Sequence, residues 1–275
     1  MIEDFQILSL SHKALPVNVL GKFQVQAVNL QEEQEKLSEL KEAFGIEELI
    51  YVSTCNRVMF IFYNAVAVNQ RHLIPFFRQI NPALASEDLE LLKKAAIFYN
   101  GIEAVEHLHR VASSLESMVI GEKEILRQIR LSFEKCMDWN LSGDHLRVLM
   151  RSTIETAKEV FSNTRIGDKQ VSVVSLAINS FLKYNPNPDS KILMIGAGET
   201  NTLVSKYLDK KGFTNVSIFN RSISNGSEIA ALFDTEVQSL DALKDFKDSF
   251  DTIFICTNAS EPILTADLYA KMLNN

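Results

Sequence analysis

The chain has 275 residues, 46% of them hydrophobic and 23% charged, and its formal net charge is −7. This composition is typical of a soluble globular protein of about two domains, and it excludes a strongly basic body that would hold nucleic acid by charge alone. The sequence has neither the ~20-residue apolar run of a membrane-spanning helix nor the basic start of a signal peptide, so we expect a cytoplasmic protein without a membrane partner.

The first 63 residues predict an α+β unit. Its expected elements are a strand at 5–10, a strand-like stretch at 22–28, a helix at 31–44 and paired strands on either side of residues 53–57. Residues 53–57 read STCNR, so a buried apolar run is interrupted by a thiol next to a guanidinium, without glycine or proline. This interruption is the first candidate for chemistry.

Helical patterns dominate from residue 69 to 184, most clearly in the segments 101–117, 121–137 and 144–163. The interval 147–165, on one probable helix, carries four basic residues: Arg147, Arg151, Lys158 and Arg165. A solvated helix surface is favoured for them over a nucleic-acid contact. The prolines of "YNPNPDS", residues 184–190, then predict a linker.

Beyond this linker, strands and helices alternate, which predicts βαβ units and a parallel sheet. The expected elements are strands at 191–196, 215–220, near 236 and at 251–257, with helices at 199–212 and 225–233 and one further helix. This half is a Rossmann-type domain, and it is shorter than a full doubly wound sheet. The fold class is therefore α/β.

The segment "GAGETN", residues 196–201, lies between a strand and a helix, where a dinucleotide pyrophosphate binds. Gly196 permits the tight turn, and Gly198 lets the backbone approach the phosphates at the helix N-terminus. Asn201 replaces the third glycine of the fingerprint, so looser packing of the helix on the strand is expected.

The residues after the second strand of this half indicate which dinucleotide binds. An NAD enzyme has an acidic residue there for the ribose hydroxyls, whereas this sequence has Asn220, Arg221 and Ser222. A guanidinium and a hydroxyl suit a 2′-phosphate, so the predicted cofactor is NADPH. A surface arginine is the simpler alternative for Arg221.

The three cysteines form no C-x-x-C pair, so neither a zinc site nor a disulfide framework is expected. Cys136 lies in an amphipathic helix and Cys256 in a buried strand, as structural cysteines do. Cys55 differs, because Arg57 and the turn amides can raise its thiolate fraction. A thiolate beside a nicotinamide domain suggests attack on an acyl carbon followed by hydride reduction of the thioester.

Four segments together resemble the glutamyl-tRNA reductase family. They are STCNR, "HLHRVASSLESMVIGEKEILRQI" (107–129), "VSVVSLAI" (171–178) and "GAGET" (196–200), and the opening "LSLSHKALPV" (8–17) is similar as well. The resemblance covers nearly the whole chain. It implies NADPH-dependent reduction of glutamyl-tRNA to glutamate-1-semialdehyde, the first committed step of tetrapyrrole synthesis by the five-carbon route. It also implies an oxidoreductase with a cysteine nucleophile.

The resemblance assigns site residues by position in these motifs. Cys55 matches the nucleophile, and His107 matches a histidine important for activity, where the helical pattern alone did not distinguish it from His109. The implied substrate-binding residues are Thr54, Asn56, Arg57, Ser117, Glu122, Lys123, Glu124 and Gln128. The implied cofactor-binding residues are Gly196, Ala197, Gly198, Glu199, Thr200, Asn201, Arg221 and Ser222, and no metal site is implied.

The resemblance also implies domains and partners. The expected domains are a catalytic glutamyl-tRNA-binding domain at 1–142, a helical connector at 143–184 and an incomplete NADP-binding domain at 185–275. The family is homodimeric through a C-terminal domain that is absent here, and glutamate-1-semialdehyde aminomutase is the expected downstream partner.

The sequence departs from the family at four positions. Glu124 replaces a glutamine and Arg127 a glycine, while Ser114 and Glu116 stand where glycine and aspartate are usual. Glu124 can face the ammonium of the glutamyl group, which we favour, or repel its carboxylate.

These departures leave two alternatives to a catalytic reductase. One is a non-catalytic relative that binds tRNA or a partner enzyme. The other is an NADPH oxidoreductase of the shikimate-dehydrogenase-like kind, which "DTIFICTNAS" (251–260) resembles but which gives no reason for STCNR.

Overall fold

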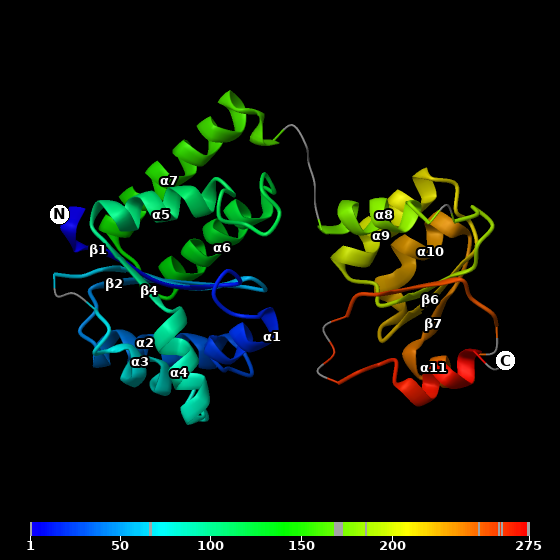
Figure 1. Cartoon of the computed structure of the whole chain (residues 1–275), viewed down its shortest axis with the longest axis horizontal. Helices are drawn as coiled ribbons and strands as arrows, with labels where there is room; N and C mark the ends of the chain where they lie inside the picture. The colour runs from blue at the N-terminus through cyan, green and yellow to red at the C-terminus, as the bar shows by residue number, and fades with distance from the viewer. Residues whose placement is uncertain are drawn as a thin grey trace. The chain divides into compact units, whose positions relative to one another are not determined.

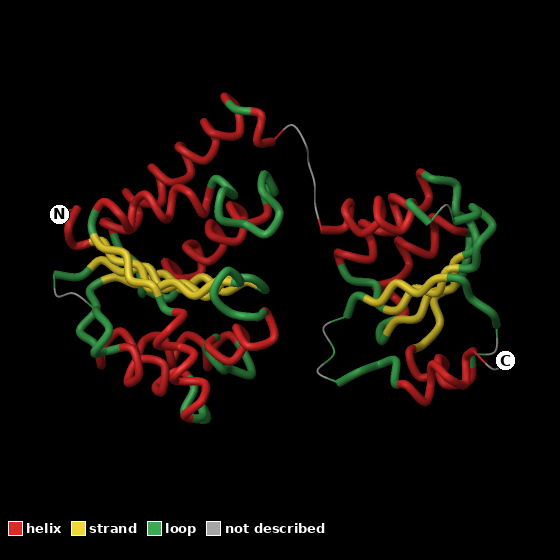
Figure 2. The backbone as a smooth tube through the Cα atoms, in the orientation of Figure 1, coloured by secondary structure: helices red, strands yellow, loops and turns green. Residues whose placement is uncertain are grey.

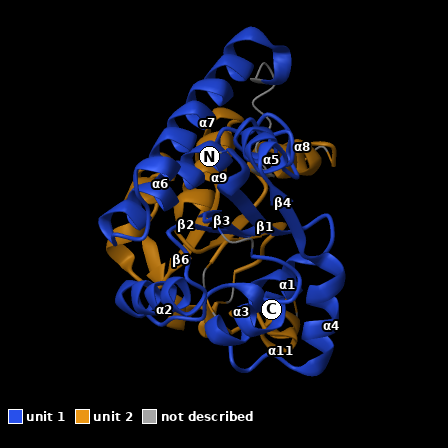
Figure 3. Cartoon of the chain, turned by 90° about the vertical axis from the view of Figure 1, so that its left-hand side faces the viewer, with its two compact units in different colours: residues 1–170 blue, residues 171–275 orange. Residues whose placement is uncertain are grey.

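A computed structural model describes the chain at residues 2–65, 68–167, 173–184, 186–246, 248–257, 259 and 261–273. The chain forms two compact units, residues 1–170 and 171–275 (Figure 3). Helix α7 (Asp144–Asn163) contributes to the core of the first unit and α8 (Val173–Leu182) to that of the second. The expected connector 143–184 is thus divided between the units, and its middle, 168–172, lies outside the described residues.

The first unit is built on an antiparallel four-stranded sheet of order β2-β3-β1-β4. Its strands are β1 (Phe5–Ser11), β2 (Glu48–Thr54), β3 (Arg57–Tyr63) and β4 (Ile97–Asn100). Its helices are α1 (Val17–Leu20), α2 (Leu30–Ala43), α3 (Leu73–Ile80), α4 (Ser86–Ala95), α5 (Ile102–Ala112), α6 (Glu124–Asp138) and α7. Helices α1 to α4 cover one face of the sheet and α5 to α7 the other (Figures 1 and 2). Both faces are therefore buried, which explains why β3 is apolar almost throughout.

Two parts of the sequence-based prediction for this unit are wrong. The stretch 22–28 is not a strand: Lys22 and Phe23 belong to the short 3-10 turn η2 (Gly21–Phe23), and the rest is irregular. Its alternation arises because Phe23 is buried against Phe77, while the Gln24 side chain donates to the Thr54 carbonyl (3.3 Å). Strand β4 lies in the region expected to be helical, because four residues at a sheet edge are too few to show a period.

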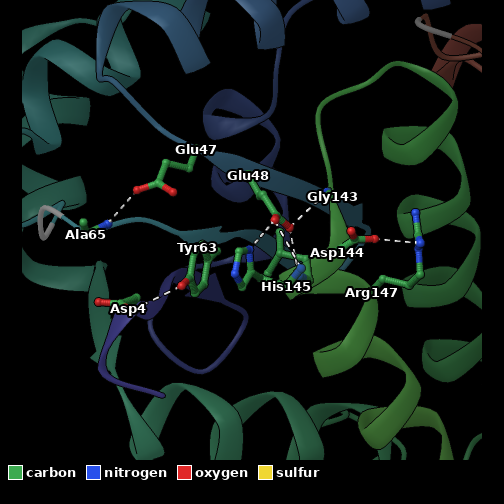
Figure 4. A network of polar contacts seen from close by, with 10 residues as sticks. Asp4, Glu47, Glu48, Tyr63, Ala65, Gly143, Asp144, His145 and Arg147 are labelled. Carbon is green, nitrogen blue, oxygen red and sulfur yellow. Dashed lines mark hydrogen bonds and ion pairs between the residues drawn. The ribbon is translucent and has the colours of Figure 1, made fainter. Parts of the chain in front are cut away.

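A buried carboxylate joins α7 to the sheet (Figure 4). Glu48 on β2 accepts hydrogen bonds from the backbone amides of Gly143 (3.0 Å), His145 (3.2 Å) and Leu146 (2.8 Å), and from His145 Nδ1 (2.8 Å). Burial opposes ionisation, yet these hydrogen bonds lower the pKa of Glu48. The His145 ring also stacks on Tyr63 with centroids 3.8 Å apart. The N-terminus of α7, which has no side-chain cap of its own, is thereby fixed to the sheet.

The second unit has a parallel four-stranded sheet of order β7-β6-β5-β8, as the alternating pattern predicted. Its strands are β5 (Ile192–Ile195), β6 (Val216–Asn220), β7 (Val237–Ser239) and β8 (Thr252–Ile255). Its helices are α8, α9 (Glu199–Lys210), α10 (Ser227–Phe233) and α11 (Ala266–Leu273), with α11 on the sheet face opposite the other three (Figure 1). After β5 the chain adds β6 and β7 on one side of it and then returns to add β8 on the other side. The carboxyl end of β5 is therefore a switch point, where such sheets bind ligands.

Within the described residues, every helix is too short or too polar to cross a membrane.

Candidate active site

Cys55 lies at the tip of the β2-β3 hairpin. Thr54 pairs with Arg57, so Cys55 and Asn56 form a two-residue turn, and neither has a positive φ. This explains why the turn contains no glycine. The Asn56 amide donates to Thr54 Oγ1 (3.2 Å), and the Asn56 carbonyl accepts from the His12 amide (2.9 Å). The exposed thiol is therefore carried on a turn that is held from both sides.

The electrostatics of Cys55 correct one expectation. Partial desolvation of the sulfur raises the pKa of the Cys55 thiol, and the Glu122 carboxylate raises it further. The Cys55 amide lowers this pKa, as expected of the turn, but Arg57 does not offset the desolvation, because its Nη2 is directed to the main-chain oxygen of Glu116 (2.7 Å). The prediction that Arg57 increases the thiolate fraction is thus wrong for the substrate-free protein.

His107 faces the sheet from α5. Its ring stacks on Tyr99 of β4 with centroids 3.9 Å apart, and its Nε2 lies 3.3 Å from Ser9 Oγ of β1. Burial, reinforced by the positive charge of Arg57, lowers the pKa of His107 to about 4, so the imidazole is neutral at neutral pH. His109 is separated from this group, and its Nε2 is buried with no hydrogen-bond partner among the described residues.

Arg57 and His107 belong to a cluster whose other members were not predicted as site residues. Lys13 follows β1, Arg110 lies in the last turn of α5, and both bind the carboxylate of Glu116. Ser9 and Tyr99 complete the cluster at His107. Ser9, a polar residue within a largely apolar strand, and the short spacing of Arg110 and Glu116 were local signals. The pair of Lys13 and Glu116, 103 residues apart, had none.

The predicted substrate residues on the loop before α6 and on α6 itself have distinct surroundings. Ser117, Glu122 and Gln128 are half-buried, and the Lys123 ammonium lies 5.7 Å from the centroid of the Phe161 ring. Desolvation raises the pKa of Glu122, and Glu124 adds to that effect.

Two of the four departures from the family pattern bind each other. The Arg127 guanidinium donates to both carboxylate oxygens of Glu124, with Nη2 2.7 Å from Oε1 and Nε 2.9 Å from Oε2. The pair is solvent-exposed at i,i+3 on α6. A paired carboxylate exerts a weaker field on a neighbouring ligand, so Glu124 disturbs the site less than an isolated charge would.

For the activity that the resemblance implies, Glu124→Gln, which restores the family residue, is expected to leave substrate binding unchanged or to weaken it less than tenfold, and to change stability by at most about 1 kcal/mol. Kinetics with glutamyl-tRNA and thermal unfolding measure the two effects. A tenfold or greater rise in kcat/KM, about 1.4 kcal/mol, would show instead that Glu124 repels the substrate carboxylate.

The second unit has a cavity of about 1060 Å³ at the carboxyl ends of its strands. Its wall includes five of the six residues predicted to form the nucleotide loop, namely Gly196, Ala197, Gly198, Glu199 and Thr200. The sixth, Asn201, is buried, and its Nδ2 donates to the carbonyls of Ile195 (3.0 Å) and Gly196 (2.8 Å). The amide therefore links the helix to the end of β5 at the position where looser packing is expected.

The residues after β6 line the same cavity. Asn220 Oδ1 accepts from the Ala197 amide (3.1 Å), and Arg221 and Ser222 follow at the rim. The Arg221 side chain is exposed, and no carboxylate occupies the end of this strand. A Cβ at Gly196 would lie 2.2 Å from the Cys256 carbonyl oxygen, so the loop fits closely against the strand end. Open glycine backbone, a helix N-terminus and a guanidinium fit a phosphorylated dinucleotide.

Comparisons with known proteins cover both units. The family description "Glutamyl-tRNAGlu reductase, N-terminal domain" matches residues 8–164, and "Shikimate / quinate 5-dehydrogenase" matches residues 181–275. Glutamyl-tRNA reductases of Syntrophobacter fumaroxidans and Thermodesulfovibrio yellowstonii are 31% and 32% identical over 97% of the chain. The chain spans 57% and 63% of those relatives. The structure of glutamyl-tRNA reductase from Methanopyrus kandleri, 27% identical, matches 99% of this chain and 63% of that one with a TM-score of 0.56.

Proposed function

Because the chain belongs to the glutamyl-tRNA reductase family, we propose that it reduces glutamyl-tRNA with NADPH to glutamate-1-semialdehyde. In this proposal the first unit binds the glutamyl end of the tRNA, and the second, which has a dehydrogenase-type nucleotide-binding fold, binds NADPH. The supporting observation is the exposed Cys55 thiol on a fixed turn, in the same unit as the buried Arg57 and the neutral His107. The aldehyde product is the substrate of glutamate-1-semialdehyde aminomutase, the expected partner.

The chemistry of the chain's own residues begins at Cys55. Its sulfur forms a bond to the glutamyl carbonyl carbon, and the ester bond to the tRNA ribose breaks. The proton of the thiol leaves with the released ribose hydroxyl, so atoms and charge balance. NADPH, when bound, supplies the hydride that converts the thioester to the aldehyde and frees Cys55.

His107 and Arg57 have supporting roles in this proposal. His107 acts in its neutral form, since its pKa of about 4 lies well below neutral pH, and it gives or accepts hydrogen bonds as the proton moves. Arg57 pairs with the side-chain carboxylate of the glutamyl group. Thr54 and Asn56 line the same pocket from the two sides of Cys55.

The decisive experiment is NADPH oxidation by this 275-residue chain in the presence of glutamyl-tRNA, with uncharged tRNA as the control. We expect oxidation with the charged tRNA only, together with a trapped semialdehyde. Binding of glutamyl-tRNA without oxidation would favour the non-catalytic relative, which the raised pKa of Cys55 makes the second candidate. The shikimate-dehydrogenase-like reading applies only to the second unit.

Arg221→Ala is expected to weaken NADPH binding by about 1.5–3 kcal/mol, the contribution of a charge-assisted hydrogen bond, and to leave NADH binding nearly unchanged. Titration of intrinsic or nicotinamide fluorescence measures both affinities. Lys206→Ala is the matched control, because Lys206 is an exposed cation of the same unit that pairs with Glu228 away from the cavity. Equal losses for both cofactors would mean that Arg221 does not contact the 2′-phosphate.

A further inference from the structure

Three cations of the first unit converge on one residue, Glu116. Lys13 binds its carboxylate, and Arg110 donates to Oε1 from Nε (2.9 Å) and Nη2 (2.8 Å). Arg57 donates to the main-chain oxygen of the same residue (2.7 Å). The Glu116 side chain is 13% exposed, whereas those of Lys13 and Arg110 are 55% and 51% exposed. The carboxylate is therefore the shielded centre of the cluster.

The charge of Glu116 is permanent under working conditions. Burial would raise the pKa of its carboxyl group, but the hydrogen bonds and positive charges of Lys13 and Arg110 hold it at about 2. A shielded carboxylate that accepts two hydrogen bonds from one arginine is worth more than an exposed pair, because solvent screens it less. Glu116 thus ties its loop to the end of β1 and to the last turn of α5.

The loop that carries Glu116, residues 113–121, needs such an anchor. Ser114 has a φ of 63°, a left-handed conformation that is costly for a residue with a side chain. Its Oγ accepts from the Gly121 amide (3.0 Å) and donates to the Val119 carbonyl (3.2 Å), which closes the loop on itself. Leu115, Met118 and Ile120 are exposed, so Val119 is the one large apolar side chain that this loop buries. Polar contacts therefore supply most of what holds this loop in place.

Arg57 depends on the position of the loop. Its side chain is buried, and a buried guanidinium must keep its N–H groups hydrogen-bonded. The main-chain oxygen of Glu116 supplies such a bond from the loop side. A shift of residue 116 would therefore turn the guanidinium or leave a donor unpaired.

We propose that Glu116 is a positioning residue for substrate recognition: its carboxylate, held by Lys13 and Arg110, fixes loop 113–121 so that its main-chain oxygen orients Arg57 toward the glutamyl group. This inference rests on the proposed function, in which Arg57 pairs with the substrate carboxylate. Lys13 and Arg110 then belong to the recognition machinery through Glu116.

The test uses the full chain with four substitutions. Glu116→Gln removes the charge and keeps the shape, whereas Glu116→Asp keeps the charge. Arg110→Gln weakens the same anchor from a half-exposed position, so it serves if Glu116→Gln fails to fold. Glu134→Gln is the matched control, because it removes an exposed ion pair with Arg130 on α6.

The first measurement is amide hydrogen exchange, which does not depend on substrate. We expect exchange in residues 113–121 to quicken about tenfold in Glu116→Gln and Arg110→Gln, with the strands of residues 48–63 unchanged. Glu116→Asp and Glu134→Gln should exchange like the parent chain. Unchanged exchange in Glu116→Gln would overturn the anchoring role.

The second measurement is the concentration of a non-reactive glutamyl-tRNA analogue, in which an amide replaces the ester to the ribose, that halves the rate of Cys55 alkylation by iodoacetamide. It reports binding without turnover, and we expect it to rise about tenfold in Glu116→Gln and to stay within threefold of the parent in Glu116→Asp. Faster exchange with unchanged protection would overturn the inference, because Glu116 would then be merely structural. If this analogue does not protect the parent chain, the proposed function fails first, and the inference fails with it.

Discussion

Cys55→Ser is expected to abolish formation of the semialdehyde while leaving folding and NADPH binding intact. A serine hydroxyl at this turn has no base to activate it, because His107 faces Ser9 and Tyr99 and has a pKa of about 4. The exposed position of Cys55 means that the substitution removes no core contact. Product trapping measures activity, and thermal unfolding with NADPH titration measures the other two properties.

The controls for this prediction are the remaining cysteines. Cys136 is buried, with its sulfur 3.5 Å from the Tyr51 amide, and Cys256 lies at the wall of the nucleotide cavity. Cys136→Ser and Cys256→Ser should both keep activity, with a modest loss of stability for the buried one. Retained activity after complete alkylation of Cys55 would show that the thiol is not the nucleophile.

The fold was predictable where a helix or strand buries one of its faces, because the apolar residues then recur along the sequence. The parallel sheet of the second unit follows from alternating strand and helix patterns, and the helices α5 to α7 follow from their apolar spacing. The stretch 22–28 misled because alternation also arises when apolar side chains anchor an irregular segment. The period of a sequence shows which residues are buried, but not whether a neighbouring strand pairs with them.

The site was predictable only in part. A thiol within an apolar run and a glycine turn before a helix are local signals, so Cys55 and the loop at 196–201 stood out. Glu116 pairs locally with Arg110, but its other partner, Lys13, is 103 residues away, and only the folded sheet brings Lys13 and Arg57 beside α5. Asn201 shows the same limit, because its two bonds to carbonyls of the preceding turn depend on backbone geometry that a missing glycine does not reveal.

Gly196→Ala is expected to abolish NADPH binding and to destabilise the second unit by at least about 2 kcal/mol. Gly196 has a φ of 95°, and its Cβ would lie 2.2 Å from the Cys256 carbonyl oxygen and 2.8 Å from Thr257 Cγ2. The backbone at Cys256, directly after β8, cannot yield as a flexible side chain can, so the strain falls on the loop. NADPH titration and thermal unfolding measure the two losses.

Gly198→Ala separates binding from stability. Gly198 has a φ of −81°, which any residue adopts, and a Cβ there would meet no atom within 4 Å. The methyl group would instead enter the cavity that Gly198 lines, where the proposed pyrophosphate approaches the helix N-terminus. We therefore expect NADPH binding to weaken tenfold or more while stability changes by less than about 1 kcal/mol. Unaltered NADPH affinity in this variant would place the phosphates elsewhere, because a cofactor lying on the glycine turn cannot share that space with a methyl group.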